Sequence, residues 1–162
     1  MILIRIAEEA DLNAITEIYN EAVKTTTSTF DTIPKTIEER RIWLKEHDEK
    51  YSVLVCEYEG VITGWASLTK WSERQAYFKS VENSIYVKEE YRGRGFATLL
   101  LQELMRRTKE SGFHTVIARI ADNNQASIKL HHDAGFEVIG VMKEVGEKFG
   151  RLIDVTIMQK IF

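Results

Sequence analysis

The chain has one cysteine among its 162 residues, so it cannot form an internal disulfide. Cys56 ends the apolar run Ser52–Cys56, where we expect a buried strand that carries a reduced thiol. A reduced thiol favours a cytoplasmic location. Long apolar runs are missing too, since none approaches the roughly 20 residues of a membrane-spanning helix. Arg5 interrupts Met1–Ile4 before the core of a signal peptide could form, so we expect no membrane segment.

The sequence also lacks an excess of positive charge. Its formal net charge is -3, which argues against a general electrostatic affinity for nucleic acid or anionic membranes. No H-E-x-x-H motif and no paired Cys/His spacing occurs, so the sequence implies no metal. Without a repeat, a linker or a low-complexity tract, the chain is expected to form a single domain over residues 1–162.

Two common phosphate-binding motifs are absent. A P-loop needs a Gly-Lys pair followed by a hydroxyl residue, and the chain has none. The dinucleotide fingerprint G-x-G-x-x-[GA] is narrowly missed, because Thr98 stands where a small residue should let helix and strand pack closely. No acidic residue ends a strand about 20 residues later, where one is expected to bind a ribose. Dinucleotide binding is therefore not expected.

The most informative segment that is present is Arg92–Ala97, which joins a strand-like run (Asn83–Val87) to an amphipathic helical run (Ala97–Lys109). Glycines at such a joint let the backbone approach a ligand, and the first helical turn offers free N–H groups and a positive dipole end. A phosphate fits such a site, and arginines match its oxygens. The alternative is an ordinary tight turn with solvated arginines.

Local patterns predict the elements of the first half of the chain. We expect a strand at Ile2–Ala7, a helix capped by Asp11 with one apolar face, and a polar loop at Thr25–Thr29 that Phe30 follows. The Thr36 capping box opens a helix to about His47. Strand-like runs follow at Tyr51–Tyr58, Val61–Thr69 and Tyr77–Val87, the first two joined as a hairpin at Glu59-Gly60.

The second half alternates helices and strands. A helix at Ala97–Lys109 stops at Ser111-Gly112, and the remaining elements are a strand at His114–Ile120, a helix at Gln125–Asp133 and strands near Glu137–Val141 and Ile153–Ile161. Antiparallel strands followed by a β-α-β-α-β order predict an α+β (α/β) fold around a sheet of mixed direction.

Four features in this order resemble the GNAT superfamily of N-acetyltransferases: the strand residue Glu82, the arginine-glycine loop, the helix headed by Asn124 and Ser127, and Leu130-His131 before Gly135-Phe136. The acetyl-CoA loop of that superfamily reads Q/R-x-x-G-x-G/A, and Arg92, Gly95 and Ala97 match it. The resemblance implies a mostly antiparallel central sheet of about seven strands flanked by about four helices, with acetyl-CoA as co-substrate.

Nearly the whole chain resembles the phosphinothricin and methionine sulfoximine N-acetyltransferases within that superfamily. The segments that carry this likeness are Thr27–Phe30, Trp71–Tyr77 and Glu82–Val87. The resemblance implies that the acetyl acceptor is the primary amine of a small amino-acid-like molecule. It also implies a homodimer with acceptor sites near the subunit interface.

By the same resemblance, particular residues are expected to hold acetyl-CoA. The backbone of Val87 and Lys88 is expected to contact the pantetheine arm. Asn124 and Ser127 are expected to contact the same arm. The residues expected to cradle the phosphates are Arg92, Gly93, Arg94, Gly95, Phe96, Ala97 and Thr98.

Two side chains are candidates for proton transfer. Glu82 is expected to act as the general base, and its alternative is a carboxylate at the solvated rim of the sheet. On strand alternation it shares a face with Ser84 and Tyr86. His131 is a possible general acid toward the departing thiolate, and its alternative is a half-buried histidine that packs on Phe136.

The resemblance also implies that Phe30, Arg74 and Tyr77 line the acceptor pocket, with Arg74 as the cation for a substrate carboxylate. Their alternative is an exposed loop with one anchoring aromatic. Two departures from the phosphinothricin enzymes stand out, because Ile153 replaces a histidine and Ser72 replaces a lysine.

Two other functions remain open. One is acetylation of a protein N-terminus or a lysine side chain, and the other is a catalytically silent module that binds acyl-CoA.

Overall fold

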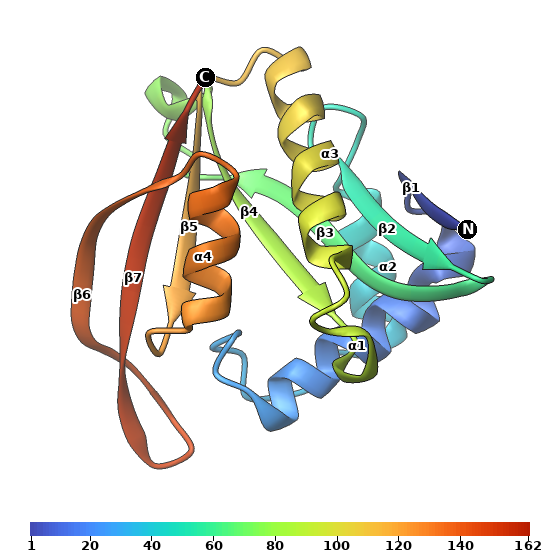
Figure 1. Cartoon of the computed structure of the whole chain (residues 1–162), viewed down its shortest axis with the longest axis horizontal. Coiled ribbons are helices and arrows are strands. Elements are labelled where there is room, and N and C mark those ends of the chain that lie inside the picture. Colours follow the sequence, from blue (N-terminus) through green and yellow to red (C-terminus); the bar gives the residue numbers. More distant parts are fainter.

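The computed structural model describes all residues from Met1 to Phe162. A seven-stranded sheet with the order β1-β2-β3-β4-β5-β7-β6 crosses the molecule, with helices on both of its faces (Figure 1). The strands are β1 (Ile2–Ile6), β2 (Val53–Tyr58), β3 (Val61–Lys70), β4 (Ser80–Val87), β5 (Thr115–Ala121), β6 (Glu137–Lys148) and β7 (Arg151–Ile161). The helices are α1 (Leu12–Thr25), α2 (Ile37–Lys45), α3 (Phe96–Glu110) and α4 (Gln125–Asp133).

All strand pairs are antiparallel except β4 with β5. The predicted fold class, a mixed and mostly antiparallel sheet with four helices, is therefore confirmed. None of the helices combines the length and the apolar character that crossing a bilayer requires.

Two apolar clusters hold the helices against the sheet. The larger one joins the buried face of α3, including Leu100, Leu101 and Leu104, to residues of β2 to β5, and α4 packs against it. The smaller one joins α1 to Trp65 of β3 on the opposite face, where α2 also packs. The 3.6-residue period of the apolar side chains in α1 and α3 therefore determines which side of each helix meets the sheet.

Asp11 stands at the N-cap position of α1, as predicted, but its side chain makes no capping hydrogen bond to the helix. Asp11 also ends a short 3₁₀ turn (Glu9–Asp11). Its carboxylate accepts two hydrogen bonds from Arg5, both at 2.8 Å, and one from the Glu8 amide. Burial opposes ionisation of Asp11, but these bonds lower its pKa below the ordinary value. A cation from β1 thus outcompetes the helix amides for this carboxylate. The Thr36 capping box of α2 is confirmed.

Two other boundaries also differ from the prediction. Tyr77 lies in a 3₁₀ turn (Gln75–Tyr77), and β4 begins only at Ser80. Strands β6 and β7 are longer than predicted and meet in a tight turn at Phe149 and Gly150, both with positive φ. Irregularities in the β6–β7 register interrupt the two-residue alternation, which hid the extra strand residues from pattern analysis.

The pairing between β4 and β5 covers only three residues of each strand. Glu82 lies opposite Ile117 in the last pair, after which β4 continues to Val87 and β5 to Ala121 without further pairing. The two strands diverge from that point toward the lower half of Figure 1. The sheet is therefore open along one edge of β4, in the middle of the molecule.

Candidate active site

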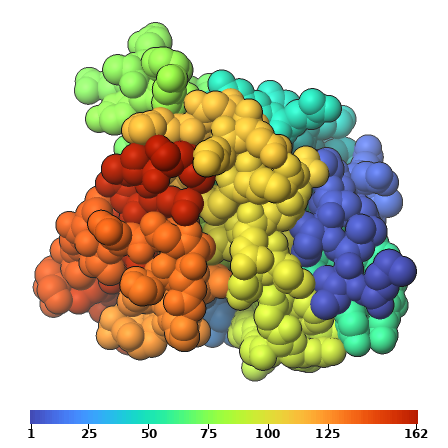
Figure 2. Space-filling model, turned by 45° about the horizontal axis from the view of Figure 1, so that its top comes forward, coloured from blue at the N-terminus to red at the C-terminus, as the bar shows by residue number.

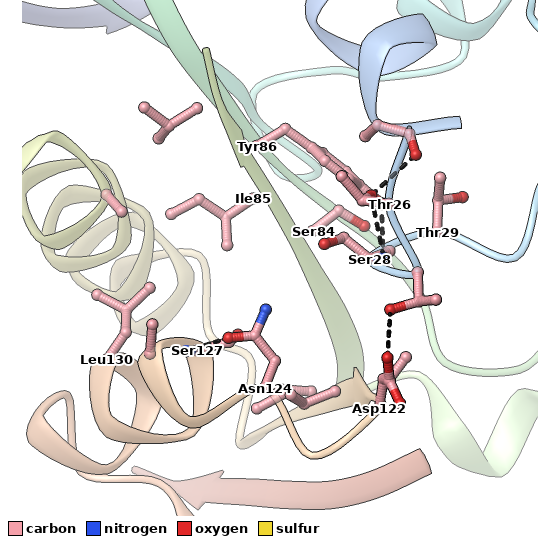
Figure 3. A pocket seen from close by; sticks show the side chains of 18 of the residues that line it. Thr26, Ser28, Thr29, Ser84, Ile85, Tyr86, Asp122, Asn124, Ser127 and Leu130 are labelled. Atoms are coloured by element: carbon pink, nitrogen blue, oxygen red, sulfur yellow. Dashed lines mark hydrogen bonds between the residues drawn. The ribbon is translucent and has the colours of Figure 1, made fainter. Parts of the chain in front are cut away.

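A cavity of about 1160 Å³ occupies the region where β4 and β5 part. Side chains from the loop after α1, from β4 and from the start of α4 converge on it (Figure 3). On the surface, α3 separates the N-terminal strand from the C-terminal segment (Figure 2). Pockets for small ligands usually measure about 300–1,000 Å³, so this cavity suits a larger molecule or two ligands side by side.

The loop before α3 has the backbone geometry of an anion site. Gly93 and Gly95 adopt positive φ values of 71° and 85°, which glycine tolerates without strain, and Gly95 is the N-cap of α3. The backbone amides from Gly93 to Thr98 have no backbone acceptor. Free amides at the positive end of a helix dipole bind phosphate groups, so this loop fits the predicted phosphate cradle.

The two arginines of the loop have different surroundings. Arg92 lines the cavity, where its Nε donates to the Val87 carbonyl at 3.1 Å. The guanidinium of Arg94 lies over the rings of Tyr58, Tyr91 and Phe96, 5.1–5.3 Å from their centroids, and Arg94 does not line the cavity. The Arg94 side chain therefore lies outside the cavity, because it stacks on aromatic rings, whereas its backbone amide is part of the loop.

The register of β3 with β4 decides which backbone groups face the open edge. The Lys88 amide donates to the Thr63 carbonyl at 2.9 Å, and its carbonyl accepts from the Tyr91 amide. Both backbone groups of Lys88 therefore have partners within the chain, and Lys88 does not line the cavity. Since hydrogen-bonding directions alternate along a strand, the backbone of Ile85 and Val87 faces the gap toward β5. Ile85 was missed because only the register reveals this.

Two predicted residues meet the cavity at the N-terminus of α4. Asn124 is the N-cap of this helix, and its side-chain oxygen accepts from the Ser127 amide at 3.1 Å. That bond leaves the side-chain nitrogen of Asn124 directed toward β4 (Figure 3). Both residues line the cavity, so α4 presents polar groups and its dipole to the same space as α3.

His131 is almost fully buried and hydrogen-bonded through both ring nitrogens. Its Nδ1 lies 2.8 Å from the Ser127 carbonyl, which can only accept, so this nitrogen carries the proton. Its Nε2 therefore accepts from the Asn83 side-chain amide at 3.0 Å. Burial lowers the pKa of His131, which favours the neutral ring. This arrangement matches the alternative of a packed histidine, with Phe136 edge-on to it, and does not suit a proton donor.

Asn83 was not singled out by the sequence analysis. Through His131 it connects β4 to α4 across the gap between the parted strands. Its side-chain oxygen is buried and has no hydrogen-bond partner, and Asn83 lines the cavity. An unpaired buried acceptor of this kind is costly unless a ligand supplies a donor.

Glu82 lines the cavity at the last pair of β4 with β5. Its carboxylate forms a two-point ion pair with Arg119 of β5, in which Nη2 lies 2.7 Å from Oε1 and Nε donates to Oε2. The Glu82 side chain is 15% exposed and that of Arg119 is 54% exposed. The predicted base therefore has a cationic partner that sequence reasoning missed. Alternation along β5 predicts that the Arg119 side chain lies on the face opposite that of the buried Ala118 and Ile120. Its ion pair with Glu82 depends on the register between β4 and β5, which the sequence does not reveal.

The loop after α1 forms another wall of the cavity and is fastened to the β6–β7 hairpin. The Phe30 ring occupies the space above Gly146, where an added Cβ would lie 2.3 Å from it. Lys148 donates to the Thr29 carbonyl at 2.8 Å. Phe30 lines the cavity, and its contact with the acceptor stays a prediction.

Arg74 and Tyr77 do not line the cavity of the single chain. They lie on the segment between β3 and β4, where a 3₁₀ turn (Gln75–Tyr77) begins after Arg74. Trp71, in the same segment, lies beside the cavity-lining Arg119, whose guanidinium is 5.9 Å from the centroid of the Trp71 ring.

Ile153 is buried in the core. The chain has no cluster of three or more His, Cys, Asp or Glu side chains that could hold a metal ion.

Comparison with known proteins supplies independent information. Residues 4–157 match the acetyltransferase (GNAT) domain family. An L-methionine sulfoximine/L-methionine sulfone acetyltransferase of Salmonella typhimurium is 41% identical, over 96% of this chain and 92% of that protein. A solved phosphinothricin acetyltransferase from Sinorhizobium meliloti in complex with acetyl-CoA superposes with a TM-score of 0.97 at 37% identity, covering 99% and 88% of the two chains. A ribosomal-protein-alanine N-acetyltransferase from Brucella melitensis superposes with a TM-score of 0.96 at 42% identity, with 99% of each chain covered.

The buried state of His131 predicts a pH-dependent stability. Above pH ~6.5 the imidazole is neutral in the folded and the unfolded chain, whereas below it the unfolded chain takes up a proton that the folded chain resists. The free energy of unfolding of wild type should therefore exceed that of His131→Gln by less at pH 5.5 than at pH 7.5. Urea denaturation of both proteins measures this difference, and His132→Gln controls for the loss of an exposed histidine. A difference that stays constant with pH contradicts the buried neutral ring.

Proposed function

The chain belongs to the GNAT acetyltransferase family, and from this membership we propose that it transfers the acetyl group of acetyl-CoA to the primary amine of a small amino-acid-like molecule. Phosphinothricin and methionine sulfoximine represent the type of acceptor. The observation that carries the proposal is the cavity between β4 and β5, which joins a phosphate-binding loop to a carboxylate at the point where the strands part.

The residues around the cavity fit acetyl-CoA along its length. The free amides from Gly93 to Thr98 suit the diphosphate, as does the cation of Arg92. The open backbone of Ile85 and the backbone amide of Val87 suit the amide groups of the pantetheine arm, which can pair with them as a further strand would. The unpaired oxygen of Asn83 offers an acceptor to the same arm, and Asn124 and Ser127 lie opposite.

In the proposed reaction, Glu82 acts as the general base. Bound acetyl-CoA supplies the acetyl group, so that a new N–C bond forms while the C–S bond of the thioester breaks. Glu82 accepts the proton that the acceptor ammonium must lose and passes it to solvent, and the thiolate leaves as coenzyme A and is protonated from water. His131 holds Asn83 and the first turn of α4 in place rather than donating a proton. General base catalysis of this kind contributes about 10²–10⁴-fold to a rate.

Acetylation of a protein N-terminus is the second candidate, because one similar structure carries the name ribosomal-protein-alanine N-acetyltransferase. The charges of the cavity favour the small acceptor. Arg119 lines it, and a cation suits the free carboxylate of an amino acid, which an N-terminal residue of a protein lacks.

We propose that two copies of the chain form a homodimer through β6. This strand is an edge of the sheet, and its exposed apolar side chains are Val138, Ile139, Val141, Met142 and Val145. An exposed apolar edge strand promotes pairing with another chain.

A cytoplasmic location is also proposed, because Cys56 is a free buried thiol and a reducing compartment keeps it so. Activity recovered only from secreted material contradicts this location.

Thiol release from acetyl-CoA, measured against a panel of acceptors, tests the proposed reaction and the role of Glu82. We expect turnover with methionine sulfoximine, methionine sulfone or phosphinothricin, and much less with peptides and polyamines. Glu82→Gln should lower the turnover rate by about 10²–10⁴-fold, because the amide cannot accept the proton, while acetyl-CoA affinity stays unchanged.

Glu46→Gln, at the exposed C-terminal end of α2, is the matched control and should keep the wild-type rate. Wild-type turnover restricted to peptides supports the second candidate instead. Tight binding of acetyl-CoA without thiol release for any amine indicates the catalytically silent module. Full activity of Glu82→Gln removes Glu82 from the mechanism.

Sedimentation velocity tests the proposed dimer. Wild type should sediment at twice the mass of the chain, and Ile139→Glu should sediment as a monomer because it places like charges at the paired edge. Ile33→Glu alters an exposed residue outside β6 and should remain a dimer. Monomeric wild type, or a dimer that survives Ile139→Glu, argues against pairing through β6.

A further inference from the structure

Arg119 lies at the mouth of the gap between β4 and β5. Ile117 of β5 forms the last strand pair with Glu82 of β4, and Arg119 comes two residues later in β5. The Arg119 side chain therefore projects from the same face of the sheet as Glu82. This face is opposite the one that α3 and α4 cover, since Ala118 and Ile120 fill that side. Arg119 is thus a cation on the acceptor side of the candidate active site.

The ion pair of Arg119 with Glu82 affects the role proposed for Glu82. Both carboxylate oxygens accept hydrogen bonds from the guanidinium, at 2.7 Å for Nη2 to Oε1 and through Nε to Oε2. A carboxylate held in this way has fewer lone pairs free to accept a proton from an ammonium group. Glu82 therefore becomes a more accessible base when part of the guanidinium is drawn away.

The guanidinium has the means to bind a second carboxylate. Of its five N–H donors, those that meet Glu82 are on Nε and Nη2, and Nη1 makes no hydrogen bond within the chain. Hydrogen bonding to Glu82 raises the pKa of Arg119, so it remains charged. Its side chain is 54% exposed toward the cavity, and the Trp71 ring lies beside it. The planar fork matches a carboxylate by two parallel hydrogen bonds.

We propose that Arg119 binds the carboxylate of the acetyl acceptor and thereby determines specificity for α-amino acids. The incoming carboxylate takes over guanidinium donors from Glu82. Because the amine and the carboxylate of an α-amino acid are attached to the same carbon, binding at Arg119 brings the ammonium next to the released Glu82 oxygen. This inference rests on the proposed acetyl transfer and names the group that the acceptor must carry.

The other arginines near the cavity are less suited to this role. Arg151 pairs with Asp122, which Thr27 also contacts, so this carboxylate is fixed in the wall between the loop after α1 and β7. Arg74 does not line the cavity. Only Arg119 contacts the carboxylate that is to receive the proton.

The test compares L-methionine sulfone with its carboxamide, which keeps the amine and side chain but has no negative charge. Wild type should prefer the acid by about 10–100-fold in kcat/KM, the effect expected of a charge-assisted hydrogen-bonded pair. Arg119→Ala should reduce the preference to within about threefold, mainly through a higher KM for the acid, and Arg119→Lys should keep part of it. Calorimetry with coenzyme A in place of acetyl-CoA should give the same order of acceptor affinities without turnover.

Arg151→Ala is the matched control, because it removes another cation from the same cavity and should retain the preference for the acid. Unchanged acetyl-CoA affinity of Arg119→Ala verifies that the protein is folded. Equal use of acid and carboxamide by wild type, or loss of the preference in Arg151→Ala but not in Arg119→Ala, overturns the inference while acetyl transfer stands. No turnover of any amine by wild type contradicts the proposed function itself.

Discussion

The early end of the pairing between β4 and β5 is the constraint on which the candidate site depends. In a continuous sheet, the backbone of Ile85 and Val87 would be satisfied by β5, and there would be no room between the strands. Here the strands separate after Glu82 and Ile117, and α3 and α4 start on either side of the gap. A ligand that restores strand-like hydrogen bonds therefore completes the sheet, and its phosphates reach the free amides at the N-terminus of α3.

The polar groups around the gap fall into two sets with different tasks. On the side of α3 and α4, the neutral His131 bridges the Ser127 carbonyl and the Asn83 amide, which fixes the width of the opening without a buried charge. On the opposite side, Glu82 and Arg119 form an ion pair that is accessible to solvent and can exchange partners. In the proposed reaction, the neutral contacts position the acetyl donor, whereas the solvent-accessible ion pair serves the acceptor.

The sequence predicted those features that depend on local residue types. The glycines before α3, the capping box of Thr36 and the apolar faces of α1 and α3 act within a few residues, so the fold class and the backbone geometry of the loop before α3 could be predicted. Asp11 failed as a cap because Arg5, from a neighbouring strand, competes for its carboxylate. The roles of Lys88, Ile85 and Arg119 depend on strand register, which brings residues far apart in the chain together and leaves no local signal.

Amide hydrogen exchange, followed by NMR with and without acetyl-CoA, tests the open strand edge most directly. The account predicts that acetyl-CoA slows exchange at Ile85, Val87 and the amides from Gly93 to Thr98, while Lys88, already bonded to Thr63, changes little. Binding of acetyl-CoA that leaves the exchange rates of Ile85 and of the α3 N-terminus unchanged would contradict the account.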